Sequence, residues 1–158
     1  MSDRQHLRVG LAGAGMISLY HLRGWAETNG AQVVAVCDTD RERATQRAAE
    51  FGIEQVFDDA DEMLDTCDLD ALDIAASVDA HAPLVRAAAA RGIHIMCQKP
   101  LTRTVAEARL LIEEVGERDR AEEVGRRAGR GLLEAGGAKI LSDLSAGFQG
   151  TPPSPGEA

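Results

Sequence analysis

A glycine-rich turn between an apolar run and a helical segment constrains the fold of this chain more than any other feature. The run Leu7–Ala12 has the character of a buried strand, and Gly13-Ala14-Gly15-Met16-Ile17-Ser18 follows it directly. Two glycines at this spacing let the backbone turn sharply and approach a ligand closely, and the N-terminus of the next helix favours bound anions. The segment therefore predicts a strand, a turn and a helix that together bind a phosphate-containing ligand.

An acid at the end of the next apolar run makes the expected ligand more specific. Asp38 follows the predicted strand Gln32–Cys37 and lies about 20 residues beyond Ser18, the last position of the glycine loop. An acid at this place accepts hydrogen bonds from the ribose of a dinucleotide and disfavours a 2′-phosphate, which predicts NAD. NADP is the less favoured alternative. It stays open because Arg41 and Arg43, whose charge would suit a 2′-phosphate, lie close by. A tight turn that binds nothing is the other interpretation of the glycine loop.

Composition excludes several classes of partner. The formal net charge of −9 opposes nonspecific binding to nucleic acid or to an anionic membrane, so a small molecule is the expected partner. The chain contains no apolar run long enough to span a membrane and its first residues lack a secretory signal, which predicts a cytoplasmic protein. Cys37, Cys67 and Cys97 are far apart and are predicted to be free thiols, and the scattered histidines predict no metal site.

Strands and helices alternate along the first three quarters of the chain, which predicts an α/β fold with a doubly wound parallel sheet of the Rossmann type. Asp40 is the expected cap of the second helix and Thr102 of the last one. The strands are expected at Leu7–Ala12, Gln32–Cys37, Gln55–Phe57, Asp70–Ala75 and Ile93–Cys97, and the helices at Met16–Thr28, Arg41–Phe51, from Asp61, at Pro83–Ala90 and at Val105–Glu117.

The character of the sequence changes after Arg118. Half of the 16 glycines and three of the five prolines lie in residues 119–158, and this segment contains no β-branched strand run. Such a composition rarely builds a core. We therefore expect a dinucleotide-binding domain over residues 1–118 and an atypical tail over residues 119–158, rich in Gly, Ala, Arg and Pro and partly helical or disordered.

A second group of polar residues follows the fourth and fifth strands. Met96-Cys97-Gln98-Lys99-Pro100-Leu101 places a lysine at the end of the fifth strand, and Ser77 and His81 follow the fourth. The carboxyl edge of a parallel sheet is where open α/β folds bind ligands. A lysine in an apolar pocket there can exchange protons near neutral pH, whereas the alternative is a solvated lysine in a turn.

With these motifs, residues 8–118 resemble the N-terminal nucleotide-binding domain of the Gfo/Idh/MocA oxidoreductases, a family that includes inositol dehydrogenase and glucose-fructose oxidoreductase. The resemblance rests on the Gly13-Ala14-Gly15 loop with His21 in the helix after it, on the strand that ends in Asp38, on His81 and above all on Lys99-Pro100. In the family this lysine lies beside the nicotinamide and the substrate carbon that loses hydride. The resemblance thus implies that Lys99 is catalytic and helps to polarise or deprotonate the substrate hydroxyl.

The predicted cofactor-binding residues are Gly13, Gly15, Met16, Ile17, Asp38, Ser77, His81, Gln98 and Lys99. Two positions depart from the family pattern, because Gln98 replaces the usual glutamate and Ala76-Ser77-Val78 replaces the common Thr-Pro-Asn. His21 and His81 show no obvious acid partner in the sequence, so we expect structural or capping roles for them. Tyr20 and Trp25 are assigned to packing.

The resemblance ends before the family's second, substrate-binding α/β domain, which nothing in residues 119–158 matches. We expect a premature end or a shifted reading frame, and a single domain that oligomerisation could protect at its open edge. The favoured hypothesis is a NAD(P)-dependent dehydrogenase of a sugar, inositol or similar polyol that retains the nucleotide-binding domain. The alternatives are a noncatalytic dinucleotide-binding module and a chain too incomplete to fold well.

Overall fold

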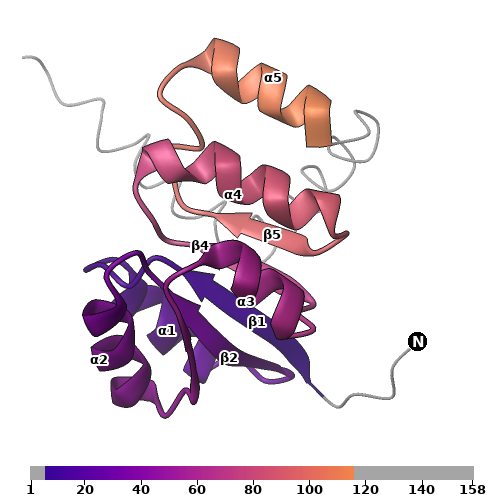
Figure 1. Ribbon diagram of the computed structural model, residues 1–158. Helices are drawn as coiled ribbons and strands as arrows, with labels where there is room; N and C mark the ends of the chain where they lie inside the picture. The colour runs from indigo at the N-terminus through magenta and orange to yellow at the C-terminus, as the bar shows by residue number, and fades with distance from the viewer. Residues whose placement is uncertain (1–5, 116–158) are drawn as a thin grey trace, which may run out of the picture. The chain divides into compact units, whose positions relative to one another are not determined.

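In the computed structural model the described residues are 6–115, and they form a five-stranded parallel sheet with helices on both faces (Figure 1). The strand order is β3-β2-β1-β4-β5, which confirms the predicted doubly wound, Rossmann-like fold. The elements in chain order are β1 (Leu7–Ala12), α1 (Ser18–Ala26), β2 (Ala31–Cys37), α2 (Arg41–Phe51), β3 (Gln55–Phe57), α3 (Ala60–Thr66), β4 (Ala71–Ile74), α4 (Val78–Ala90), β5 (His94–Cys97) and α5 (Val105–Val115).

The strand order reverses at β1, and this reversal positions the candidate site. The chain runs from β1 outward through β2 to β3, and then returns to β4 on the other side of β1 before reaching β5. Ligands of open α/β folds bind beyond the carboxyl ends of the strands where the order reverses. Gly13 follows β1 and Ala75 follows β4 at this point, and Ala75 donates its N–H to the carbonyl of Ala12 over 2.8 Å.

The central strand supplies side chains to two buried clusters on opposite faces of the sheet. Leu11 belongs to the cluster that α1 and α2 cover, and Ala12 to the cluster that α3, α4 and α5 cover. Successive residues of a strand point to opposite faces, so an apolar run with no polar alternation fits a strand buried on both sides. The helical members are Leu22, Ala44 and Ala48 in the first cluster and Met63, Leu64, Val85, Ala88 and Leu111 in the second.

The start of α4 differs from the prediction. The sequence predicts this helix over Pro83–Ala90, and proline fits best at the first helical position. The helix begins instead at Val78, so that Pro83 lies inside it. His81, Val85 and Ala88 are buried at helical spacing on both sides of the proline, and this burial outweighs the hydrogen bond that Pro83 cannot donate.

The cap of α5 also differs from the prediction. Thr104, and not Thr102, precedes the helix and forms a capping box with Glu107. The Thr104 N–H donates to Glu107 Oε2 over 3.1 Å, and the Glu107 N–H donates to Thr104 Oγ1 over 3.2 Å. The spacing Thr-x-x-Glu is the sequence signature of this arrangement.

The edge of the described sheet bears on the expected partners. Within residues 6–115, β5 is an edge strand, Met96 on it is 43% exposed, and α5 packs on α4 with Val105 and Leu110 exposed. Oligomerisation through this edge stays a prediction.

The predicted boundary near Arg118 and the tail at 119–158 lie outside the described residues. Among the helices of residues 6–115, none has the length and apolar character that crossing a membrane requires.

Free thiols give the domain a predicted sensitivity to alkaline pH. Burial, with Asp38 and other nearby carboxylates adding to it, raises the pKa of the Cys37 thiol to about 12, and burial raises that of Cys97 to about 11. The unfolded thiols ionise near pH 9 and the folded ones only above it, so their contribution to stability is complete below pH 9 and falls between pH 9 and 12.

Urea unfolding at pH 8, 9 and 10 measures this effect. We expect the free energy of unfolding to decrease with pH more steeply in the parent protein than in Cys37→Ala, because the variant lacks the thiol that the unfolded chain would ionise. Equal slopes in the two proteins would contradict the prediction.

Candidate functional site

The first glycine of the loop is required by the backbone. Gly13 has φ of +100°, and a Cβ atom at this position would lie 2.5 Å from the backbone nitrogen of Ala76. Its N–H donates to the carbonyl of Cys37 over 2.8 Å. Gly13 thus lets the chain leave β1 in close contact with both β2 and β4, and only glycine fits there.

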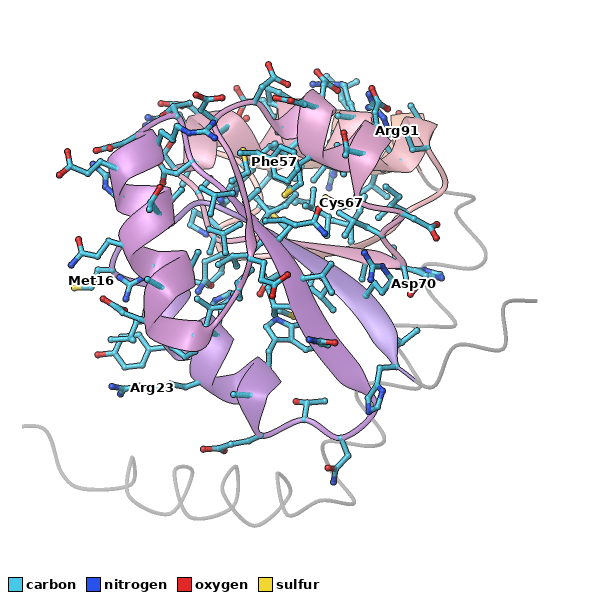
Figure 2. The ribbon with its side chains drawn as sticks, turned by 60° about the horizontal axis from the view of Figure 1, so that its bottom comes forward. Met16, Arg23, Phe57, Cys67, Asp70 and Arg91 are labelled. Carbon is cyan, nitrogen blue, oxygen red and sulfur yellow. The ribbon has the colours of Figure 1, made fainter. Side chains whose placement is uncertain are left out.

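The second glycine leaves space for a ligand. No heavy atom lies within 4 Å of the position that a Cβ of Gly15 would occupy. The backbone N–H groups of Gly15, Met16 and Ile17 have no acceptor among the described residues, and no side chain caps α1. Free N–H groups at a helix N-terminus attract anions, so the loop is suited to an anionic group such as a phosphate. Met16 is 80% exposed and points outward (Figure 2).

Two neighbours hold the loop in this shape. Ser18, at the position of the third glycine, is fully buried and its hydroxyl donates to the carbonyl of Gly15. The guanidinium of Arg47 donates to the same carbonyl over 3.3 Å from α2. The small size of Ser18 allows the close packing of helix and strand for which the glycine pattern has its third glycine. Arg47 carried no signal in the sequence, because its contact depends on how α2 packs beside the loop.

Asp38 lies beside the loop at the end of β2, as predicted. Its Oδ2 accepts the N–H of Ala14 over 2.7 Å and its Oδ1 accepts the N–H of Asp40 over 2.9 Å. The guanidinium of Arg43 is 3.8 Å from Oδ1. A cleft of about 430 Å³ extends from these residues to Ser77 and Pro83. The carboxylate can still accept a ribose hydroxyl, because each of its oxygens has a second lone pair.

His81 is enclosed and bound to backbone carbonyls. It is 1% exposed, its Nδ1 lies 3.0 Å from the carbonyl oxygen of Pro100, and its Nε2 lies 3.1 Å from that of Ala76. These bonds connect the ends of β4 and β5, which agrees with the structural role expected for His81. Direct contact of His81 with a cofactor stays a prediction.

His21 has an acid partner that the sequence analysis did not find. The His21 Nδ1 lies 2.9 Å from both oxygens of Asp73, whose side chain on β4 is completely buried. Trp25 Nε1 donates to Asp73 Oδ2 over 2.8 Å. The expectation that His21 lacks an acid partner is wrong, and Trp25 has a polar contact beyond packing. Tyr20 is 60% exposed, so its assignment to packing is also wrong.

Gln98 and Lys99 lie at the end of β5. The Nε2 of Gln98 is 3.1 Å from His21 Nε2, and its Oε1 accepts the Lys99 N–H over 2.7 Å. Lys99 itself is exposed. The structure therefore brings the predicted residues that follow β1, β2, β4 and β5 to one edge of the sheet.

Within residues 6–115, no group of three or more His, Cys, Asp and Glu side chains could hold a metal ion.

The described domain is similar to known NAD-binding oxidoreductases. Residues 7–125 match a family described as an oxidoreductase family with an NAD-binding Rossmann fold. The chain is 42% identical over 102 residues to D-apiose dehydrogenase of Paraburkholderia graminis. The aligned region covers 65% of this chain and 27% of that protein. It is 46% identical over 105 residues to inositol 2-dehydrogenase 4 of Saccharopolyspora erythraea, and this aligned region covers 65% of this chain and 30% of the relative.

Solved structures with bound dinucleotide are similar as well. Levoglucosan dehydrogenase in complex with NADH superimposes with a TM-score of 0.66 at 31% identity, over 70% of this chain and 32% of that one. An oxidoreductase from Agrobacterium radiobacter in complex with NAD+, L-tartaric acid and magnesium gives a TM-score of 0.66 at 31% identity, over 68% and 32% of the two chains. The chain thus spans about a third or less of the length of these relatives.

Proposed function

Because the chain belongs to the oxidoreductase family with the NAD-binding Rossmann fold, the Gfo/Idh/MocA family, we propose that residues 6–115 bind a nicotinamide dinucleotide, NAD in preference to NADP. The pyrophosphate would lie at the free N–H groups of Gly15, Met16 and Ile17, and the adenosine ribose at Asp38. The open space at Gly15, beside N–H groups without an acceptor among the described residues, is the observation that carries this proposal, since no heavy atom beyond the neighbouring residues lies within 4 Å of the place where a Cβ would be.

For the whole protein we propose a dehydrogenase that oxidises a CH–OH group of a sugar, an inositol or a similar polyol. The relatives named as apiose and inositol dehydrogenases support this substrate class. The bound dinucleotide would accept the hydride. Lys99, exposed at the same edge of the sheet, would take the hydroxyl proton, and Ser77 and His81 would border the nicotinamide half of the site.

Calorimetric titration with NADH and then NADPH tests the binding proposal. We expect saturable binding of NADH and weaker binding of NADPH, and absence of heat with both dinucleotides would refute the proposal. A turnover assay with NAD and a panel of polyols tests the second part. Binding of NADH without turnover of any polyol would favour a noncatalytic dinucleotide-binding module.

The preference for NAD is tested by Asp38→Asn. The amide keeps an acceptor for the Ala14 N–H but removes the charge that would repel a 2′-phosphate. Arg43 loses one of its two carboxylate partners and keeps Asp40 at 3.1 Å, so its guanidinium can also contact that phosphate. We expect the ratio of NADPH to NADH affinity to rise about tenfold, which corresponds to about 1.4 kcal/mol.

Glu54→Gln is the matched control for Asp38→Asn. It makes the same change of charge at an exposed acid that has no polar partner among the described residues. The ratio of affinities should stay at the parental value in this control. An unchanged ratio in Asp38→Asn would remove Asp38 from the ribose site.

A further inference from the structure

A continuous series of hydrogen bonds leads from the interior of the sheet to Lys99. It begins at Asp73, whose carboxylate is completely buried and receives the indole N–H of Trp25 and the Nδ1 of His21. Both side chains come from α1, where positions 21 and 25 are one helical turn apart. A carboxylate only accepts hydrogen bonds, so the His21 proton is at Nδ1.

This proton position determines the role of the other ring nitrogen. In a neutral imidazole with its proton on Nδ1, Nε2 is an acceptor, and it lies 3.1 Å from Gln98 Nε2. The amide NH₂ of Gln98 therefore donates to His21. The amide oxygen must then point the other way, where it accepts the Lys99 N–H over 2.7 Å. Every donor in the series meets an acceptor, and only this orientation of the amide satisfies both contacts.

We propose that His21 is a positioning residue for Lys99, which it holds through the amide of Gln98. The inference rests on the proposed function in one respect, because the proposed proton transfer is the reason why Lys99 would need a fixed position at the edge of the sheet. Asp73 fixes the tautomer of His21, the tautomer fixes the amide of Gln98, and the amide fixes the backbone of Lys99. The series ties Lys99 to α1 and β4, both of which adjoin the glycine loop.

Nuclear magnetic resonance of the folded chain without cofactor tests this inference. We expect His21 to show one protonated ring nitrogen at Nδ1 and one unprotonated nitrogen at Nε2. We also expect at least a tenfold loss of hydrogen-exchange protection at the Lys99 amide in both His21→Phe and Gln98→Met. The double variant should lose no more than either single variant, because both changes break the same series of bonds.

Two further variants separate positioning from general loosening of the fold. Trp25→Phe removes the other donor to Asp73 and leaves His21 and Gln98 in place, so the Lys99 amide should keep its protection. Gln98→Glu offers His21 only acceptors, and we expect both ring nitrogens to be protonated while the Lys99 amide stays protected.

Unchanged protection of the Lys99 amide in Gln98→Met, which leaves the His21 bonds to Asp73 intact, would overturn the inference. So would a proton on Nε2 of His21 in the parent protein. Neither measurement needs a bound dinucleotide. Failure of NADH to bind would refute the proposed function and leave these two results to decide the inference by themselves.

Discussion

Gly13→Ala is expected to lower the free energy of unfolding by about 4 kcal/mol, a large share of the stability of a small domain. The new Cβ would lie 2.5 Å from the Ala76 nitrogen and 2.7 Å from the Ala75 carbonyl carbon, and both atoms are backbone. The φ of +100° adds strain for any residue other than glycine. Urea unfolding measures the loss, and a change below about 1 kcal/mol would contradict this account.

Gly15→Ala should have the opposite pattern of effects. Its backbone is not in the left-handed region and its Cβ would enter open space, so the free energy of unfolding should hardly change. We expect NADH affinity to fall about 100-fold, equivalent to about 2.7 kcal/mol, because the methyl group would occupy the space proposed for the pyrophosphate. Calorimetric titration of the variant measures the affinity.

Gly24→Ala is the matched control for Gly15→Ala. Gly24 is also a glycine of the α1 region with no heavy atom near its Cβ position, but it lies inside the helix and away from the loop. Alanine there should leave NADH affinity unchanged and raise stability by about 1 kcal/mol, since it favours the helix. Equal loss of affinity in both variants would mean that the loop is not the binding site.

Asp73→Ala is the second substitution with a large expected effect, a loss of about 3 kcal/mol in the free energy of unfolding. It leaves the N–H groups of His21 and Trp25 without their buried acceptor, and each orphaned donor costs about 1 to 3 kcal/mol. Asp73→Asn should lose less, because the amide oxygen can still accept one of these donors. Urea unfolding of both variants measures the difference.

A double-mutant cycle shows whether the loss at Asp73 has this cause. Trp25→Phe should cost less in the Asp73→Ala background than in the parent, because the indole N–H has no acceptor to lose there. Strictly additive effects would show that the buried carboxylate stabilises the domain in some other way.

Local signals in the sequence were sufficient for much of the fold. The bounds of α2 follow from Asp40, whose side chain accepts the Arg43 N–H, and from Gly52, whose left-handed φ of +68° ends the helix. The glycine loop and Asp38 were predictable for the same reason, since the strand, the turn, the helix and the acid all lie within one short segment of the sequence.

Contacts between distant segments could not be predicted from these signals. The contact of His21 with Asp73 joins residues 52 positions apart, and that of His81 with Pro100 joins residues 19 positions apart. Both depend on the pairing of β4 with its neighbours. One signal was present, because an acid between Leu72 and Ile74 in an apolar strand is costly to bury unless donors surround it. Such an acid predicts hydrogen-bond donors close to it, although not which residues supply them.

The two hydrogen bonds of Asp38 carry an evolutionary consequence. One carboxylate oxygen supports the backbone of the glycine loop at Ala14, and the other supports the chain at Asp40 before α2. The residue proposed to select the nucleotide is therefore also part of the scaffold, and a substitution that alters the selection without weakening the loop must keep an acceptor for the Ala14 N–H. A lineage that changes its cofactor preference needs a substitute acceptor for the Ala14 N–H before or together with the loss of the acid, so epistasis restricts the order of its mutations.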